Sequence, residues 1–381
     1  MHNLKIITLL LLLPLAIYSQ RNDSDDNSWE YCSHNNLDLG IISFGNSQNF
    51  SGLRFNWSDC DLGTINGINF TMWKPDEDIN SYSEVNGMSL GVFPAAGHLN
   101  GLNFGLTGML GTESIKGINL GGLAVISEGS ITGISIGGLA LVAQRDMMGI
   151  SFAGLANVAQ GDMTGVSFGG LANVAQGSMN GLNIGGLANV AQGDMQWINF
   201  STLALVTQGN MTGVNLSGLA CVAQGEMTGF SFGGLALVSQ EGLTGVNLSG
   251  AALVSENRIT GLNIGGFAVV SSDDDIVGFN ATIGALVAEY GSIKGINIAG
   301  YKTEAEYIGG LNISAILTKA YDFSGVSISI YNGFKGTQNG LSIGLWNYAE
   351  SLNGVQIGLI NVAKNNSSPF KVLPFINAHF D

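Results

Sequence analysis

The stretch MTGVSFGGLANVAQGS, from Met163 to Ser178, recurs with a 16-residue period through the middle of the chain. The glycine of its Thr-Gly-Val element marks this period, at Gly117, Gly133, Gly149, Gly165, Gly181, Gly213, Gly229, Gly245 and Gly261. Trp197 occupies the one slot in the series that lacks the glycine. Weaker copies precede this block and shorter copies follow it, so nearly the whole chain is a repeat array.

The array and the N-terminal segment define the expected domain organisation. Residues 1–20 are typical of a cleaved secretory signal peptide, with Lys5 before an apolar run that is too short to span a bilayer. Residues 21–32 are polar, and we expect a disordered lead-in there. We predict a single β-repeat domain over 33–381, with regular repeats at about 115–272 and a terminal strand at 370–380.

The composition excludes several classes of protein. Of 381 residues, 57 are glycine and only 11% are charged, which argues against a disordered chain. The 13 Lys and Arg residues against 28 Asp and Glu residues give a net charge of -15, which argues against nucleic-acid binding. In the central repeats nearly all charges lie in turns of the Gln-Gly-Asp type, where Gly followed by Asp, Ser or Asn signals a tight turn.

Within each repeat, large apolar residues alternate with small ones, as expected for a half-buried β-strand. Val166 and Phe168 therefore share one face of the expected strand. The shorter C-terminal repeat has only Gly358 where the regular repeat has two glycines, so we interpret the Gly-Gly pair as a bulge or corner that shifts the alternation by one residue. That shift adds three residues to the same face: Leu171, Asn173 and Ala175.

Two all-β architectures fit this pattern, and we favour a large antiparallel transmembrane β-barrel. Each repeat would be one of about 22 strands, with the apolar face toward lipid and the charged turns at the rims. A strand of about 13 residues tilted by about 40° rises roughly 30 Å, which matches a bilayer core. The aromatic segment at the C-terminus also resembles the final strand of outer-membrane barrels.

The alternative is a β-solenoid with about 16 residues per coil. Parallel coils place like residues on like, which accounts for the constant repeat length and for the Met, Ile or Leu after every turn. This alternative has corners at Gly169–Gly170 and at 176–178. It places four residues in the interior, namely Met163, Val166, Phe168 and Leu171, and leaves an outer face of small residues with few charges.

Motifs for catalysis or cofactor binding are not found in the sequence. No Gly-Lys-Ser/Thr element follows a glycine-rich loop, and no Gly-x-Ser-x-Gly element lies between a strand and a helix. We therefore expect a protein that is not an enzyme and that binds no cofactor. Trp197 interrupts the repeat, but an aromatic residue at a strand end is typical of packing or of a membrane interface.

Acidic clusters and cysteines supply the candidate sites. The clusters at 76–78 and at Asp273, Asp274 and Asp275 have oxygen ligands that Ca²⁺ prefers, although neither matches a known Ca²⁺-binding loop and solvated acidic turns are the simpler interpretation. Cys32 and Cys60 flank the first strand-like segments and are a candidate disulfide pair in an oxidising compartment. Cys221 occupies a repeat position that elsewhere carries Asn, Leu or Val, so we expect it to be buried.

The elements NGVQIGLINVA (353–363) and GGLANVAQ, with the closing LPFINAHF (373–380), resemble bacterial surface repeat-containing proteins. The resemblance covers most of the mature chain and implies export, an outer-membrane or cell-surface location and no assigned activity. We therefore expect a structural, porin-like or surface-interaction role with membrane lipid as a partner. The alternative is a secreted solenoid that binds a partner through a flat Gly/Ser/Asn face. The sequence leaves a protein or glycan partner and the oligomeric state open.

Overall fold

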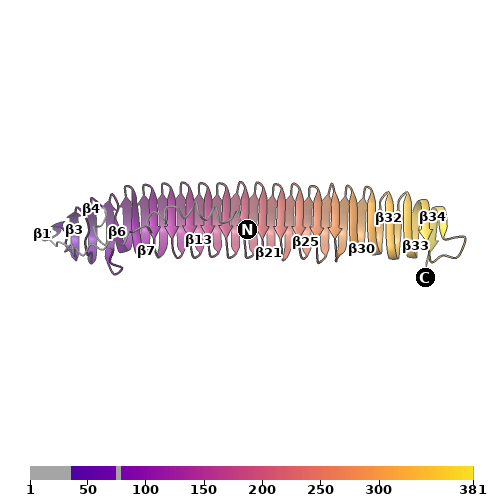
Figure 1. The fold of residues 1–381 in the computed structure, drawn as a ribbon, viewed down its shortest axis with the longest axis horizontal. Helices are drawn as coiled ribbons and strands as arrows, with labels where there is room; N and C mark the ends of the chain where they lie inside the picture. Colours follow the sequence, from indigo (N-terminus) through magenta and orange to yellow (C-terminus); the bar gives the residue numbers. More distant parts are fainter. Residues whose placement is uncertain (1–35, 74–78, 381) are drawn as a thin grey trace, which may run out of the picture. The chain divides into compact units, whose positions relative to one another are not determined.

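The structure is a computed structural model that describes residues 36–73 and 79–380. Over these residues the chain is all β, and its strands follow one another in a regular stack (Figure 1). The expected signal peptide at 1–20 and the expected lead-in at 21–32 lie outside the described residues.

Each 16-residue repeat forms one coil with two strands. In the coil that begins at Met163, β13 (Met163–Gly169) is the first strand and β14 (Ala172–Ala175) is the second. β13 pairs in parallel with β11 (Met147–Ala153) and β15 (Met179–Gly185). β14 pairs in parallel with β12 (Ala156–Ala159) and β16 (Ala188–Ala191). The first strands form one sheet and the second strands form another, and these sheets are the two layers of a β-solenoid.

The predicted antiparallel barrel of about 22 strands is therefore wrong, and the alternative, a solenoid with about 16 residues per coil, is confirmed. The register shows the physical reason, because Met163 lies opposite Met179 and Asn173 opposite Asn189. The confinement of charge to turns, which favoured the barrel, has another cause in a solenoid. At the corners the carboxylates accept hydrogen bonds from turn amides of the next coil, as Asp146 does from Asp162 and Asp162 does from Ser178.

The strands keep this arrangement along the stack. The first layer also contains β2 (Ile42–Gly45), β3 (Phe50–Asn56), β4 (Thr64–Thr71), β5 (Glu84–Gly91), β9 (Ser130–Gly137), β17 (Met195–Ser201), β19 (Met211–Ser217), β21 (Glu226–Gly233), β23 (Gly242–Ser249), β25 (Ile259–Gly265), β27 (Ile276–Thr282) and β29 (Ser292–Ala299). The second layer also contains β8 (Ala124–Ser127), β10 (Ala140–Ala143), β18 (Ala204–Thr207), β20 (Ala220–Ala223), β22 (Ala236–Ser239), β24 (Ala252–Ser255), β26 (Ala268–Ser271) and β28 (Ala285–Ala288). Longer strands run through both layers: β6 (Ala95–Gly105), β7 (Gly108–Gly121), β30 (Lys302–Ser314), β31 (Leu317–Ile328), β32 (Tyr331–Ile343) and β33 (Trp346–Ala363).

Two corners join the layers in each regular coil. The Gly-Leu corner, at Gly170–Leu171 and its equivalents, follows the first strand, and the Gln-Gly corner, at 176–178 and its equivalents, follows the second. The solenoid interpretation placed its corners at Gly169–Gly170 and at 176–178, so both are found within one residue of their predicted positions.

The interior differs from the one that the sequence predicted. The buried positions of the coil are Met163, Ser167, Gly169, Asn173 and Ala175. Phe168 and Leu171 are instead 38% and 46% exposed, and Val166 is half-buried on the same outer surface. Of the four residues expected inside, only Met163 is there.

The error comes from the assumed shift at the Gly-Gly pair. In the regular coil the alternation continues through the Gly-Leu corner, so outward Phe168 is followed five residues later by inward Asn173. In the last coil, outward Ile357 is followed only four residues later by inward Asn361, because this corner is one residue shorter. The shift therefore occurs in the short repeat with the single glycine, and the regular repeat has none.

Columns of asparagine make the polar interior stable. The Nδ2 of Asn157 donates to the Oδ1 of Asn173 at 2.8 Å, and the Nδ2 of Asn173 donates to the Oδ1 of Asn189 at 2.9 Å. An amide side chain both donates and accepts, so neighbouring asparagines of a column satisfy one another away from water. The run ends at Asn157, which lies beside Leu141 and whose Oδ1 has no hydrogen-bond partner among the described residues. Cys221 takes this position in its coil and is fully buried, as predicted, and burial raises the pKa of its thiol to about 12.

Antiparallel strands close both ends of the stack. β1 (Asn36–Leu39) pairs antiparallel with β2, and β34 (Val372–His379) pairs antiparallel with β33. β34 lies within the segment 370–380 that was expected to be a terminal strand, and it covers the end of a solenoid. The unpaired backbone groups of a free edge would be a template for other chains, so these strands limit end-to-end association.

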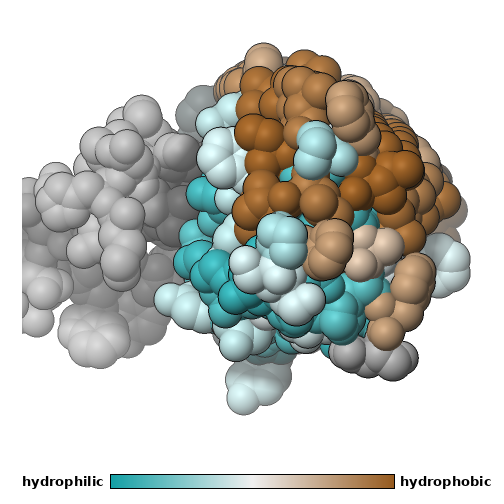
Figure 2. All heavy atoms as spheres, turned by 90° about the vertical axis from the view of Figure 1, so that its right-hand side faces the viewer, coloured by the Kyte–Doolittle hydropathy of each residue, from teal (hydrophilic) through white to brown (hydrophobic). Residues whose placement is uncertain are grey.

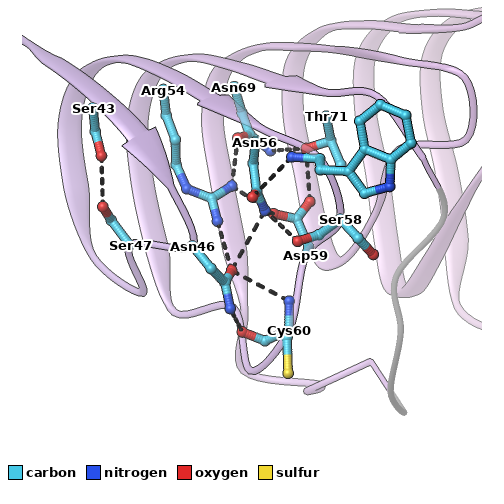
Figure 3. A network of polar contacts seen from close by, with 11 residues as sticks. Ser43, Asn46, Ser47, Arg54, Asn56, Ser58, Asp59, Cys60, Asn69 and Thr71 are labelled. Carbon is cyan, nitrogen blue, oxygen red and sulfur yellow. Dashed lines mark hydrogen bonds and ion pairs between the residues drawn. The ribbon is translucent and has the colours of Figure 1, made fainter. Parts of the chain in front are cut away.

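A buried ion pair terminates the polar interior at the N-terminal end (Figure 3). Arg54 extends the inward Ser/Asn column of the first layer and is fully buried. Its Nη1 donates to Asp59 and, at 2.7 Å, to the Oδ1 of Asn69, and its Nη2 donates to the Oδ1 of Asn46 at 2.9 Å. The hydroxyl of Thr71 also donates to Asp59, at 2.8 Å. The charge of the guanidinium is thus balanced inside the end of the stack.

Candidate binding surfaces

Two columns of outward side chains on the first layer are apolar in every coil. The Val166 column contains Leu53, Ile68, Met88, Leu102, Ile118, Ile134, Ile150, Val166, Leu182, Ile198, Val214, Phe230, Val246, Leu262, Phe279, Ile296, Leu311, Val326, Leu341 and Val355. The Phe168 column contains Phe55, Phe70, Leu90, Phe104, Leu120, Ile136, Phe152, Phe168, Ile184, Phe200, Leu216, Phe232, Leu248, Ile264, Ala281, Ile298, Ile313, Ile328, Ile343 and Ile357. We call these two columns, with the corner beside them, the outer apolar face.

The apolar surface continues around the Gly-Leu corner onto the second layer. Leucines stack at this corner from Leu123 to Leu235, and the outward Ala172 and Val174 columns follow on the second layer. Apolar side chains therefore cover both layers and the corner that joins them. Figure 2 shows the result in the end view, where hydrophobic residues gather on one side of the stack and hydrophilic residues on the other.

Nearly all charged residues of the regular coils lie at the opposite, Gln-Gly corner. Their carboxylates order the turns, because the Oδ1 of Asp146 accepts from the amide of Asp162 at 2.9 Å and the Oδ1 of Asp162 accepts from the amide of Ser178 at 2.7 Å. The regular coils are thus apolar at one corner and polar at the other, with an acidic residue in most of them.

Exposed tryptophans accompany the outer apolar face. Trp57 directly follows β3 and Trp73 lies two residues after β4, at the end of the first layer that adjoins the Gly-Leu corner. Trp197 is 71% exposed and lies between Gln196 and Ile198, at the polar margin of the Val166 column. A large ring with one polar atom is suited to a boundary between apolar and aqueous surroundings.

A groove interrupts the repeat in the C-terminal coils. On the second layer the Val174 column runs from Val142 to Val287 and is then replaced by Glu304, Lys319, Gly333 and Tyr348. These residues line a hollow of about 1120 Å³, which we call the tyrosine–lysine groove. Its lining also includes Tyr290, Lys302, Glu306, Tyr321, Tyr331 and Lys335.

Gly333 lies in the lining of the groove and leaves room for the ring of Tyr331. The ring of Tyr331 lies over this glycine, and a Cβ there would approach the Cε1 of Tyr331 to 2.5 Å. Tyr331 also contacts Trp346 in a T-shaped arrangement with ring centroids 6.1 Å apart. The tyrosine ring is therefore held flat against the second layer in the coil that lacks an outward side chain.

Ion pairs fix the carboxylates of the groove. The Nζ of Lys302 lies 2.8 Å from Glu304, and its hydrogen bond, together with the charges of Lys302, Lys319 and Lys335, lowers the pKa of Glu304. The Nζ of Lys364 and the hydroxyl of Tyr348 donate to Glu350 at 2.8 and 3.0 Å, and both hydrogen bonds lower the pKa of Glu350.

Lys319 and Lys335 are exposed, and neither forms an ion pair with any residue in the described part of the chain.

The groove was not predicted from the sequence, although a signal was present. Most of the chain's nine tyrosines lie in 290–348, where the repeat period also shortens.

The structure places the predicted Ca²⁺ candidates at one Gln-Gly corner, between β26 and β27. Asp274 lies 3.5 Å from Arg258, and Asp275 lies 2.8 Å from Lys294 and accepts from the amide of Ser292. Burial would raise the pKa of Asp275, but these hydrogen bonds outweigh it and lower the pKa. Among the described residues no three acidic, His or Cys side chains form a metal-binding group. Ca²⁺ binding at Asp273, Asp274 and Asp275 stays a prediction, and 76–78 lie outside the described residues.

Of the predicted disulfide pair Cys32–Cys60, only Cys60 lies among the described residues. Cys60 is disulfide-bonded, and its backbone carbonyl accepts from the Nδ2 of Asn46 at 2.8 Å beside the buried Arg54. Cys32 lies outside the described residues, so the Cys32–Cys60 pairing stays a prediction.

Comparisons with protein-family models, with curated proteins and with solved structures found no match for this chain. The resemblance to bacterial surface repeat-containing proteins therefore stays a prediction. Within 36–73 and 79–380, no helix has the length and apolar character needed to cross a bilayer.

Proposed function

We propose that this chain is an exported, non-catalytic β-solenoid that attaches to a lipid surface through its outer apolar face. The observation that carries the proposal is the pair of first-layer columns through Val166 and Phe168, which contain no polar or charged residue from β3 to β33. An exposed apolar surface of this extent is typical of a membrane or protein interaction site. The Ser and Asn columns, through which the solenoid alternative would bind a partner, are buried between the layers, which supports the apolar face as the binding surface.

The shape of the apolar surface favours lipid over a protein partner. A flat partner, including a second copy of this chain, would cover one layer and leave the other exposed. Acyl chains are fluid and can surround the Gly-Leu corner from both sides at once. With the corner inserted into lipid, Trp197 at the polar margin lies at the membrane–water interface, where tryptophan and tyrosine are enriched in membrane proteins.

The charge distribution supports the same orientation. The net charge is -15, and the acidic Gln-Gly corner is opposite the apolar corner, so its carboxylates stay in water when the apolar corner is inserted. Attachment should therefore depend on burial of apolar area, without a need for anionic lipid.

The test is flotation of the mature chain with phosphatidylcholine vesicles at about 0.1 M and about 1 M NaCl. We expect the protein to float with the vesicles at both salt concentrations. A triple variant, Phe152→Gln, Phe168→Gln and Phe200→Gln, should reduce the floated fraction at least about tenfold, because it places amides in the Phe168 column. The matched control changes the Gln-Gly corner of nearby coils, with Gln160→Ala, Gln176→Ala and Gln192→Ala, and should float like the parent chain.

Wild-type protein that stays at the bottom of the gradient would contradict lipid attachment. If sedimentation shows instead a stable dimer that the triple variant dissociates, the face binds a second copy and the lipid proposal is wrong. The proposed export and outer-membrane or cell-surface location are tested separately, by fractionating cells that express the full chain. Recovery of uncleaved protein in the cytoplasm would refute them.

A further inference from the structure

We propose that the tyrosine–lysine groove binds a neutral oligosaccharide. The groove lies on the second layer, formed by β28 and by β30 to β33, whereas the Val166 and Phe168 columns lie on the first layer. This inference therefore goes beyond lipid attachment and does not depend on it.

The groove departs from the repeat in a way that a purely structural role does not require. Valine stacks on valine along the Val174 column, which gives the second layer a uniform apolar surface. In the C-terminal coils this column contains Glu304, Lys319, Gly333 and Tyr348 instead, so the uniform surface ends there. The resulting hollow of about 1120 Å³ is slightly larger than the range of about 300–1,000 Å³ typical of small-molecule sites. An extended ligand of several rings suits it better than a single small molecule.

The aromatic lining provides a platform for a sugar ring. A pyranose has a face of C–H groups, which packs well on a flat aromatic ring, and an edge of hydroxyl groups, which needs hydrogen-bond partners. Tyr331 is held over Gly333 and against Trp346, so its ring is ordered before a ligand arrives. Tyr321 and Tyr348 line the same hollow on either side of it in the sequence. A preordered aromatic surface lowers the entropy cost of binding.

The polar lining provides both kinds of hydrogen-bond partner that hydroxyl groups need. Glu304 and Glu350 are held as acceptors by Lys302 and by Lys364 with Tyr348. Lys319 and Lys335 are exposed, form no ion pair with a described residue and have ammonium groups that can donate.

The charges of the lining favour a neutral ligand over an acidic one. Three lysines, at 302, 319 and 335, are accompanied by four glutamates, at 289, 304, 306 and 350. The groove therefore has no excess of positive charge with which to attract a polyanion.

The two fixed carboxylates are suited to hold a sugar and unsuited to cleave it. Hydrolysis of a glycosidic bond needs a carboxylic acid whose pKa is raised so that it can protonate the leaving oxygen. A hydrogen bond from Lys302 lowers the pKa of Glu304, and hydrogen bonds from Lys364 and Tyr348 lower the pKa of Glu350, which keeps both carboxylates ionised. The expected event is reversible binding with no bond broken.

Isothermal titration calorimetry of the mature full chain tests this proposal, with cellotetraose, maltotetraose and chitotetraose as neutral probes and tetragalacturonate as the acidic comparator. We expect saturable binding of at least one neutral probe with a Kd below about 1 mM. Tyr331→Ala should weaken that binding at least about tenfold, and Tyr331→Phe, which keeps the ring, should leave it within about twofold.

Two further variants keep the test decisive. Lys319→Ala changes an exposed side chain, so it should leave folding intact and still weaken binding several-fold. Tyr301→Ala, at the Gly-Leu corner outside the groove, is the matched control and should bind like the parent chain. The proposal is wrong if no neutral probe gives saturable heat, if tetragalacturonate binds at least as tightly, or if Tyr331→Ala and Lys319→Ala both leave the affinity unchanged.

Discussion

At the scale of single residues, the departure of Trp197 from the glycine column is the clearest anomaly. Gly165 has a φ of +117°, and its neighbours in the column are also in the region that side chains rarely adopt. Trp197 has a φ of +79° in the same column, with its ring exposed. A bulky residue in this conformation costs about 1–3 kcal/mol. Trp197→Gly removes this cost, but glycine adds conformational entropy to the unfolded chain, which offsets part of the gain. We expect a net stabilisation of the fold by about 1 kcal/mol, measured as a higher urea midpoint.

The same variant should weaken flotation with vesicles, because it removes a ring from the margin of the outer apolar face. The reverse control is Gly165→Ala, whose Cβ would overlap the carbonyl oxygen of Gly149, and it should lower the urea midpoint. If Trp197→Gly destabilises the chain, then the tryptophan is there for packing and our assignment of it to the lipid boundary fails.

At the scale of elements, the N-terminal coils depend on the buried Arg54–Asp59 pair. Asp59→Asn leaves the guanidinium of Arg54 without an anion in a site where neither side chain is more than 4% exposed. Breaking a buried pair in this way costs about 3–5 kcal/mol. We expect amide hydrogen exchange to accelerate in β3 and β4 by several orders of magnitude, with little change in the central coils, because each coil contacts only its neighbours.

The exposed pair between Arg145 and Glu113, 3.6 Å apart, provides the comparison. Glu113→Gln should leave exchange unchanged in β7, which contains Glu113, and in the neighbouring β9, since exposed ion pairs contribute little. Protection in β3 and β4 that survives Asp59→Asn would show that Arg54 does not hold the end of the stack.

The solenoid alternative located both corners from the sequence, whereas the favoured barrel made each repeat a single strand. The side of the sheet that Asn173 occupies could not be predicted. The 16-residue period and the Gly and Gln-Gly signals located both corners, because turns have residue requirements that act locally. The burial of Asn173 and the exposure of Phe168 depend on neighbours one coil away. An isolated Asn is costly to bury, and the parallel register, with Asn157 and Asn189 above and below it, provides its side-chain partners.

The groove escaped prediction for a related reason. Glu304, Lys319, Gly333 and Tyr348 are 14 or 15 residues apart, outside the 16-residue period, and become one column only in the register of β30 to β33. Their residue types alone indicate ordinary surface positions, so the concentration of tyrosines in 290–348 was the remaining signal.

At the scale of the whole molecule, stability should be close to a sum over coils that are interchangeable in the central block. Deleting Met163–Ser178 removes one complete coil and brings β11 beside β15. Every column is then restored with an equivalent residue, since Met147 faces Met179 and Asn157 faces Asn189. We expect this variant to melt cooperatively by circular dichroism within about 5 °C of the full chain.

The matched deletion of residues 163–170 removes half a coil and should behave differently. It places residues of the second layer where the first layer needs its glycine column and its inward Ser and Asn side chains. Polar groups would then be buried without partners, and apolar residues of the outer face would be placed inside, so we expect the cooperative transition to be lost. A half-coil deletion as stable as the full-coil deletion would mean that like-on-like register is not what holds the coils together. The balance between buried asparagine columns and an apolar exterior would then need another explanation.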